Sequence, residues 1–198
     1  MIETRIPVGC VVMAAGNASR FGNNKLLADA GGKTLIERAL DAVPADRLRA
    51  VRVVTQYPAV EALAARYGFL CIRNDRPDLG ISRTVRLGLE ALSGTCGAIV
   101  FMVADQPYLR RTSVAALADL FQAHPDRIVC LSSGGRRGSP CIFPAEFYPE
   151  LMALTGDTGG SAVIRAHPDR VLLLDAGAAE LADADTPEAL ARLIRADG

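Results

Sequence analysis

The sequence has no excess of charge of either sign. Among its 198 residues, 22 Lys and Arg balance 22 Asp and Glu, so the formal net charge is zero with the histidines neutral. Proteins that bind nucleic acid usually carry a clear basic excess or patch, and we therefore expect no nucleic-acid partner. No apolar run approaches the ~20 residues that span a bilayer, and residues 1–5 lack the basic start and long apolar stretch of a secretory signal. These absences favour a cytoplasmic protein without a membrane partner.

Cysteine pairs with CxxC spacing are absent as well. The five cysteines are an odd number, so any disulfide scheme leaves one thiol over. Four of them lie in or beside short apolar segments, and the fifth, Cys96, just precedes one. We expect reduced, buried thiols that pack as small hydrophobic side chains, and no disulfide framework.

Short apolar runs rich in β-branched residues alternate with longer amphipathic stretches along the chain. Apolar residues make up 50% and charged residues 22%, which excludes an intrinsically disordered chain. The alternation is typical of an α/β domain with a largely parallel sheet. Because the strands read as continuous apolar runs, helices are expected on both faces of the sheet. No Pro/Ser-rich linker divides the chain, so we expect one domain over residues 1–198.

The boundaries of these elements follow from the same pattern. The expected strands are Val8 to Met13, Val51 to Thr55, Phe69 to Ile72, Ala98 to Val103, Ile128 to Leu131, Cys141 to Phe143 and Val171 to Leu174. The expected helices are Thr34 to Val43, Ala59 to Tyr67, Ser82 to Leu92, Ser113 to Ala123, Phe147 to Leu154, Ser161 to Ala166 and Pro187 to Arg195.

The first expected strand runs into a polar loop that contains glycine. The strand ends in Ala14-Ala-Gly16, whose small side chains let a ligand lie against the backbone. The loop adds Gly22 and two cations, Arg20 and Lys25. Backbone amides and fixed positive charge suit a polyphosphate, and open α/β sheets bind ligands beyond the carboxyl ends of their strands. The alternative is an ordinary strand-to-helix turn that happens to contain two basic residues.

Two common nucleotide-binding motifs do not fit this loop. The spacing of Gly16 and Gly22 does not satisfy GxGxxG, so a dinucleotide fingerprint is absent. Gly32-Lys-Thr34 resembles the end of a P-loop, but the first glycine of that motif would fall at Leu27 and no strand leads into it. We interpret Gly31-Gly32 as a turn before the next helix, with Lys33 exposed.

Carboxylates are expected on the same edge of the sheet as this loop. Asp105 follows a wholly apolar strand, where it could bind Mg²⁺ together with phosphate oxygens or could cap the following turn. Asp183 and Asp185 precede the last expected helix. Asp185 could be a helix N-cap, a metal ligand or both, whereas Asp183 is the weaker candidate for a ligand.

These motifs together resemble those of the molybdenum cofactor nucleotidyltransferases (MobA-like), and among them the molybdenum cofactor cytidylyltransferases. The resemblance covers nearly the whole chain. In chain order, the motifs that carry it are Ala14-Ala-Gly-x-x-x-Arg-x-Gly-x-x-Lys25, Asn74, Gly80-Ile-Ser-Arg-Thr-Val-Arg-Leu-Gly88, Ala104-Asp-Gln-Pro107, Gly138-Ser-Pro140, Gly156-Asp157 and Asp183-Ala-Asp-Thr-Pro187.

The resemblance implies a Rossmann-like, three-layer αβα sandwich with a mostly parallel sheet, of the nucleotide-diphospho-sugar transferase type. Its N-terminal half would bind a nucleoside triphosphate, with Ala14, Ala15 and Gly16 lining the base and ribose. Arg20 and Lys25 would hold the triphosphate as the catalytic cations. Ala15 stands where guanosine-using relatives tend to carry a second glycine, which favours CTP.

The resemblance also implies further contacts and a metal. Asn74 and the segment from Gly80 to Thr84, Ser82 included, would contact the nucleoside. Asp105 would hold Mg²⁺ together with Asp185. The implied reaction is the Mg²⁺-dependent transfer of CMP from CTP to the phosphate of molybdenum cofactor (molybdopterin), with release of pyrophosphate and with a molybdenum hydroxylase as the partner that receives the product.

One departure from the family pattern leaves two alternatives open. Relatives often carry a basic residue soon after the positions of Gly156-Asp157, whereas this chain has Thr158-Gly-Gly-Ser161 and no cation before Arg165. The acceptor could therefore be another phosphorylated molecule, such as a sugar or alditol phosphate. A module that binds molybdenum cofactor without catalysis is the remaining alternative, although it would not need Asp105, Lys25 and Arg20.

Overall fold

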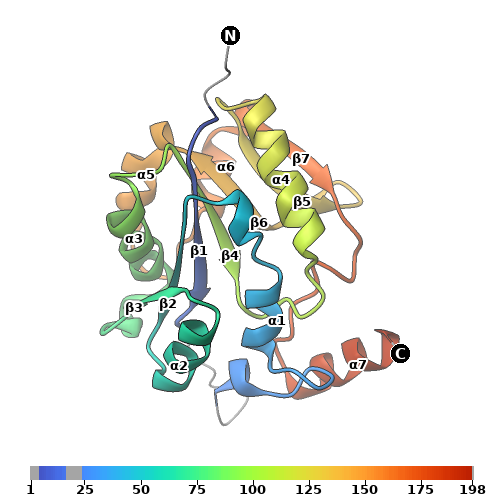
Figure 1. Cartoon of the computed structure of the whole chain (residues 1–198). Coiled ribbons are helices and arrows are strands. Elements are labelled where there is room, and N and C mark those ends of the chain that lie inside the picture. Colours follow the sequence, from blue (N-terminus) through green and yellow to red (C-terminus); the bar gives the residue numbers. More distant parts are fainter. Residues whose placement is uncertain (1–4, 17–23, 198) are drawn as a thin grey trace.

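Seven strands form one sheet in the computed structural model of the chain, which describes residues 5–16 and 24–197 (Figure 1). The strands are β1 (Val8–Ala14), β2 (Ala50–Thr55), β3 (Leu70–Arg73), β4 (Ala98–Val103), β5 (Ile128–Ser133), β6 (Arg136–Pro144) and β7 (Val171–Asp175). Their order across the sheet is β3-β2-β1-β4-β6-β5-β7, and β6 is the one strand of the seven that runs against the others. The expected, mostly parallel sheet is confirmed.

Seven α-helices accompany these strands in the described part of the chain. They are α1 (Leu35–Asp41), α2 (Pro58–Arg66), α3 (Ile81–Leu92), α4 (Arg111–Ala123), α5 (Tyr148–Met152), α6 (Ser161–Ala166) and α7 (Pro187–Asp197). Each expected helix is present, with ends that differ by a few residues from the expectation.

Side chains of the central strands alternate between two apolar layers. In β4, Val100 and Met102 join the layer formed with α1, α2 and α4, whereas Ile99 and Phe101 join the layer formed with α3, α5 and α6. This alternation follows from the two-residue period of a strand, and each fully buried aliphatic side chain contributes about 1.5–3 kcal/mol. Helices therefore cover both faces, and the three-layer αβα fold is confirmed.

The segment before α1 is a glycine turn followed by a capped helix start. Gly31 and Gly32 have φ angles of 78° and 82°, a region that glycine adopts without strain. Thr34 is the N-cap of α1, and its side chain and that of Glu37 form a reciprocal capping box. Lys33 is exposed and pairs with Asp41. The P-loop-like tripeptide is thus a turn and a helix cap, as the sequence predicted.

The sixth strand is longer than the sequence predicts. The apolar pattern indicates only Cys141 to Phe143, whereas β6 begins at Arg136 and forms an antiparallel hairpin with β5. The connection is Gly134-Gly135, and both glycines have positive φ, which suits a two-residue hairpin turn. The first half of β6 escapes prediction because its polar and glycine residues carry no apolar signal.

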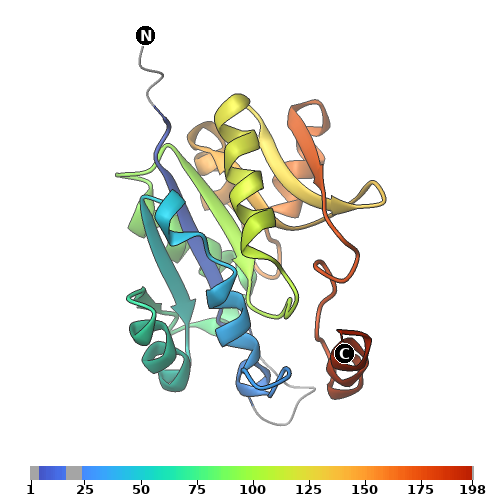
Figure 2. The ribbon, with the colours of Figure 1, turned by 45° about the vertical axis from the view of Figure 1, so that its right-hand side comes forward.

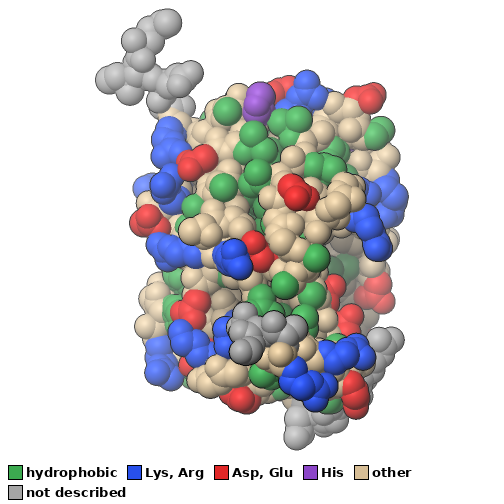
Figure 3. Space-filling view, turned by 90° about the vertical axis from the view of Figure 1, so that its right-hand side faces the viewer, with side chains coloured by type: hydrophobic (Ala, Val, Ile, Leu, Met, Phe, Trp, Pro, Cys, Tyr) green, Lys and Arg blue, Asp and Glu red, His purple; other side chains and the backbone are tan. Residues whose placement is uncertain are grey.

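Helix α7 and the edge strand β7 lie on one side of the molecule (Figure 2). Leu190 is buried against Ala30, Leu35 and Ala184 in a small third apolar cluster. On the face that carries β7 and α7, hydrophobic side chains reach the surface along the middle, while Lys and Arg side chains gather along the margins (Figure 3). Within the described residues, every helix is too short or too polar to cross a lipid bilayer.

Candidate functional site

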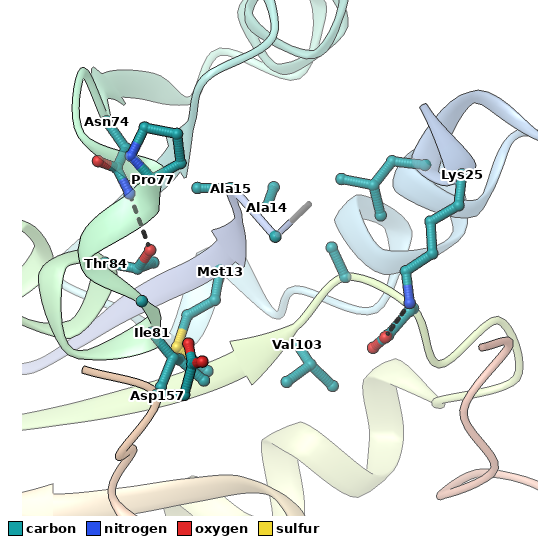
Figure 4. Close-up of a pocket in the computed structure, with 15 residues that line it drawn as sticks. Met13, Ala14, Ala15, Lys25, Asn74, Pro77, Ile81, Thr84, Val103 and Asp157 are labelled. Carbon is teal, nitrogen blue, oxygen red and sulfur yellow. Dashed lines mark hydrogen bonds and ion pairs between the residues drawn. The ribbon is translucent and has the colours of Figure 1, made fainter. Parts of the chain in front are cut away.

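A cavity of about 400 Å³ lies beyond the carboxyl ends of β1 and β4 (Figure 4). These strands pair in parallel with Met13 opposite Val103, so they end at the same level. The chain leaves β1 for β2 and β3 on one side and returns to β4 on the other, which makes this edge a topological switch point. Open α/β sheets bind their ligands at such points.

The end of β1 forms one wall of the cavity with small residues. Ala14 and Ala15 are buried, and they line the cavity together with Gly16. The three carbonyl oxygens of this segment accept hydrogen bonds of 2.9 Å from the side chains of Thr55, Gln56 and Tyr57, respectively. The loop after β2 therefore holds the strand end in place, a positioning role that the sequence did not reveal.

Lys25 and Asp105 form an ion pair at one end of the cavity. The ammonium nitrogen Nζ lies 2.7 Å from Asp105 Oδ2 and 3.3 Å from Asp185 Oδ1. The side chains of Lys25 and Asp105 are 19% and 20% exposed, whereas that of Asp185 is 61% exposed. Partial burial by itself would lower the pKa of Lys25, but the hydrogen bonds and negative charges of Asp105 and then Asp185 raise this pKa above its usual value. The ammonium is thus charged at neutral pH.

The segment before α7 is attached to the loop after β4. The backbone N–H of Ala184 donates to the carbonyl oxygen of Asp105 over 2.8 Å, and the side-chain amide of Gln106 donates to Asp183 over 3.0 Å. Thr186, rather than Asp185, caps α7, since its hydroxyl accepts from the backbone N–H of Ala189. The simple N-cap interpretation of Asp185 is therefore wrong, and its carboxylate reaches Lys25 instead.

Asn74 lies at the opposite end of the cavity from Lys25 (Figure 4). The residue is 2% exposed, and its side chain donates to Thr84 Oγ1 over 3.3 Å and accepts from the backbone N–H of Arg76. These bonds fix the turn that leads from β3 to α3. Thr84 also lines the cavity, so both polar side chains border the space at this end.

Gly80 allows two loops to meet beside Asn74. Its φ is 79°, and an added Cβ would lie 2.4 Å from the carbonyl carbon of Gly156. The backbone N–H of Ser82 donates to the carbonyl oxygen of Gly156 over 3.1 Å. This contact places Asp157 in the cavity lining, next to Ile81.

The structure brings most of the residues singled out in the sequence to one cavity. Its lining includes Ala14, Ala15, Gly16, Lys25, Asn74, Gly80 and Asp105. Asp185 joins this set through Lys25, whereas Ser82 is fully buried at the start of α3 and is not among the lining residues. Arg20 lies outside the described residues. Sequence reasoning missed the lining role of Asp157, although Gly156-Asp157 was part of the family resemblance.

The oxygen donors beside Lys25 suit a hard divalent cation. Within residues 5–16 and 24–197 no group of three or more His, Cys, Asp or Glu side chains could hold a metal by itself. Mg²⁺ typically takes one or two protein carboxylates and completes its shell with water and substrate phosphates. Asp105 and Asp185, which share the ammonium of Lys25, provide this kind of incomplete set.

Comparison with known families agrees with this geometry. The model of the MobA-like NTP transferase domain matches residues 10–171, which include β4 and all but the first two residues of β1. The chain belongs to this family. The protein is therefore a nucleotidyltransferase of the MobA-like family, as the motifs predicted.

Two proteins with different names are similar in sequence to this nucleotidyltransferase. The purine catabolism protein PucB of Bacillus subtilis is 30% identical over 201 residues, which cover 94% of this chain and 95% of PucB. The bifunctional protein GlmU of Paracoccus denitrificans is 32% identical over 145 residues, covering 68% of this chain but only 31% of GlmU.

Solved structures with the same fold span nearly the whole chain. Rv0371c of Mycobacterium tuberculosis, 23% identical, superposes with a TM-score of 0.78 over 97% of this chain and 99% of its own, and it has also been solved with manganese. A CMP:2-keto-3-deoxy-manno-octonic acid synthetase complexed with CTP is 14% identical and has a TM-score of 0.71 over 98% of both chains. The molybdopterin-guanine dinucleotide biosynthesis protein A of Archaeoglobus fulgidus is 16% identical and has a TM-score of 0.72 over 96% of this chain and 98% of its own.

Proposed function

We propose that this MobA-like enzyme transfers CMP from CTP to the phosphate of molybdenum cofactor, as a single domain that uses Mg²⁺ and supplies a molybdenum hydroxylase. The observation that carries the proposal is the cluster of Lys25, Asp105 and Asp185 at the end of the cavity opposite Asn74. A cation and two carboxylates at the end of a nucleotide-sized space suit a metal-bound triphosphate. A module that only binds its ligand would not need this cluster.

The proposed reaction is an in-line substitution at phosphorus. An oxygen of the acceptor phosphate attacks the α-phosphorus of CTP and forms a new P–O bond. The bond from the α-phosphorus to the bridging oxygen breaks, and pyrophosphate leaves with that electron pair. The acceptor phosphate is already anionic at neutral pH, so the reaction requires no strong general base. This agrees with a cavity lining that contains no histidine among the described residues.

The main barrier is the approach of one anion to another. The charged ammonium of Lys25 would contact the triphosphate and stabilise the negative charge that moves onto the leaving pyrophosphate. Asp105 and Asp185 would hold the divalent cation, which when bound neutralises phosphate charge. Arg20 would add a second cation from its loop, as the family pattern implies.

The other end of the cavity would hold the nucleoside. The segment from Ala14 to Gly16 would form the wall beside it with small residues. The hydrogen bonds that its carbonyl oxygens accept from the loop after β2 keep this wall in position. Asn74 and the segment from Gly80 would approach the base and ribose. Ala15 supports cytidine because its methyl group narrows the space where guanosine-using relatives tend to have glycine.

The segment after Asp157 supports a second class of acceptor. Thr158-Gly-Gly-Ser161 provides no cation where relatives often have one. A sugar or alditol phosphate is therefore the alternative acceptor, with the same attack on the α-phosphorus.

The test is a panel of the four nucleoside triphosphates, each with Mg²⁺ and molybdenum cofactor, in which pyrophosphate release is measured. CTP alone is expected to support release, and only when the cofactor is present. Release with GTP alone would overturn the choice of base. Release with CTP and a sugar or alditol phosphate, but not with molybdenum cofactor, would favour the alternative acceptor.

A further inference from the structure

A second cavity of about 460 Å³ lies directly beside the first, and Val103 lines both. It occupies a gap in the sheet. Strands β4 and β6 pair from Ala98 opposite Pro144 as far as Phe101 opposite Cys141, and no further pairing joins the described residues of these two strands. Beyond that point, residues 136–139 of β6 form one wall of the cavity, and Val103 with Gln106 forms another.

The third wall of this cavity is fixed by hydrogen bonds to the loop after β4. The segment around Leu181 follows β7 and carries Glu180, which is 6% exposed and accepts from the backbone N–H of Arg110 over 3.1 Å. Gln106 donates to Asp183 over 3.0 Å and to the carbonyl oxygen of Leu181 over 3.4 Å. The cavity is therefore formed before any ligand binds.

Arg136 and Arg137 are the cations of this lining. Both are exposed, and neither guanidinium has a hydrogen bond or ion pair with another described residue. Most other arginines of the described chain are paired, for example Arg111 with Asp46 and Arg170 with Glu146. Two unpaired guanidinium groups beside a preformed cavity are suited to an anion, since a guanidinium binds phosphate through paired N–H donors.

The two arginines flank the gap from opposite faces of the sheet, because neighbouring residues of a strand point to opposite sides. Arg137 lies opposite Ser132 of β5, and Ser132 has the same alternation as Ile128 and Cys130, which pack in the layer on the α3 side. Met13, which lines the first cavity, packs in this same layer, and Ile81 of that lining is the first residue of α3. An anion beside Arg137 would thus lie on the face of the sheet that also carries Met13 and Ile81 of the first cavity.

We propose that Arg136 and Arg137 bind a phosphate ester of the acceptor in this second cavity. The inference rests on the proposed nucleotidyl transfer and assigns the acceptor's place in it. It also accounts for the missing cation after Gly156-Asp157, because the hairpin supplies the positive charge from another part of the chain. Among the described residues, the one carboxylate in the lining is that of Asp183, which accepts a hydrogen bond from Gln106 and leaves the guanidinium groups unpaired.

Steady-state kinetics with CTP, Mg²⁺ and molybdenum cofactor test this assignment. Arg136→Gln and Arg137→Gln are each expected to raise the KM for the acceptor about 10-fold, and the double variant about 100-fold, as the loss of charge-assisted hydrogen bonds predicts. The KM for CTP is expected to stay within about twofold. Arg49→Gln is the matched control, because Arg49 is exposed, precedes the amino end of β2 and lines neither cavity. An unchanged acceptor KM in the double variant would overturn the assignment, and a parallel rise in the KM for CTP would assign the arginines to the triphosphate instead.

A binding measurement without turnover separates this proposal from the proposed function. Inorganic phosphate is titrated into the ¹⁵N-labelled protein, and the Nε–Hε signals of the arginines are followed by NMR. Shifts at Arg136 and Arg137 are expected, with none at Arg49. If these shifts occur while molybdenum cofactor gives no pyrophosphate, the acceptor of the proposed function is wrong and the anion site stands. If molybdenum cofactor reacts but the two signals do not move, the anion site is wrong.

Discussion

The ammonium nitrogen of Lys25 lies 2.7 Å from Oδ2 of Asp105, although 80 positions separate the two residues in the chain. Lys25 follows the loop after β1, and Asp105 follows β4. Their contact is a consequence of parallel pairing, because β1 and β4 end at the same level of the sheet. The pair lies where the anionic end of a nucleotide in the cavity would meet protein charge.

Replacing Lys25 with Met is expected to lower kcat/KM for nucleotidyl transfer about 10²–10³-fold. Methionine keeps an unbranched side chain of similar length but lacks the charge that would stabilise the leaving pyrophosphate. Thermal unfolding should show that the variant is folded. Lys33→Met is the matched control, since Lys33 forms an exposed ion pair with Asp41 away from the cavity. A folded Lys25→Met variant with near-normal kcat/KM would remove Lys25 from the catalytic machinery.

Removing divalent ions with a chelator is expected to stop pyrophosphate release without unfolding the protein. Lys25 forms ion pairs with both Asp105 and Asp185, so neither carboxylate depends on a metal for a positively charged partner. Circular dichroism and the melting temperature should therefore stay the same with and without chelator. Added Mg²⁺ should restore release in the native protein but not in Asp105→Asn. Full restoration in that variant would exclude Asp105 as a metal ligand.

Gly80→Ala is expected to disturb both stability and the nucleoside end of the cavity. The new Cβ would lie 2.4 Å from the Gly156 backbone, and φ at this position is positive, so the backbone must move. We expect a loss of about 1–3 kcal/mol in unfolding free energy, measured in urea. Gly94→Ala is the control, because a Cβ there meets nothing within 4 Å. Equal effects of the two substitutions would contradict this account.

The sequence predicts the fold well because apolar runs and amphipathic stretches are cleanly separated in this chain. It fails for the first half of β6, where the pairing depends on the hairpin turn at Gly134-Gly135 rather than on apolar residues. Strand ends are also predictable, since Asp105 and the Ala14–Gly16 segment both stand at the end of apolar runs. Because the two strands are parallel, their carboxyl ends, and with them these residues, lie at the same edge of the sheet.

The parts of the site that could not be predicted depend on long-range hydrogen bonds. Asp185 reaches Lys25 only because the N–H of Ala184 donates to the carbonyl oxygen of Asp105. The close contact of Gly80 with Gly156 likewise joins segments that share no local pattern. In such cases the residue types in the sequence suggest a function, but only the tertiary structure shows which residues contact one another.

Cys71 is expected to be the first of the five thiols to react with iodoacetamide. Cys10, Cys96 and Cys130 are buried, and the thiol of Cys141 donates to the carbonyl oxygen of Gly138. Cys71 is partly exposed on the edge strand β3, although burial and then the charge of Glu61 raise its pKa, so labelling should increase with pH. Mass spectrometry of the native protein after brief labelling at pH 8 provides the measurement. Equal labelling of Cys10 and Cys71 would contradict the buried core.

Thr34→Ala is expected to destabilise the protein more at neutral pH than at low pH. The backbone N–H and then the hydroxyl of Thr34 donate to the carboxylate of Glu37, and these bonds hold the pKa of Glu37 below its usual value. A carboxyl group with a lowered folded-state pKa stabilises the folded protein above its unfolded-state pKa, near 4.5, and this contribution is lost as the pH falls through the folded-state pKa. The loss of the cap should cost about 0.5–2 kcal/mol at pH 7 in urea unfolding. At pH 3 the cost should be smaller but not zero, because the hydroxyl also accepts from the backbone N–H of Glu37 whatever the pH. Thr34→Ser keeps the hydroxyl and should behave like the native protein, whereas an equal cost of Thr34→Ala at both pH values would show that the carboxylate plays no part in the cap.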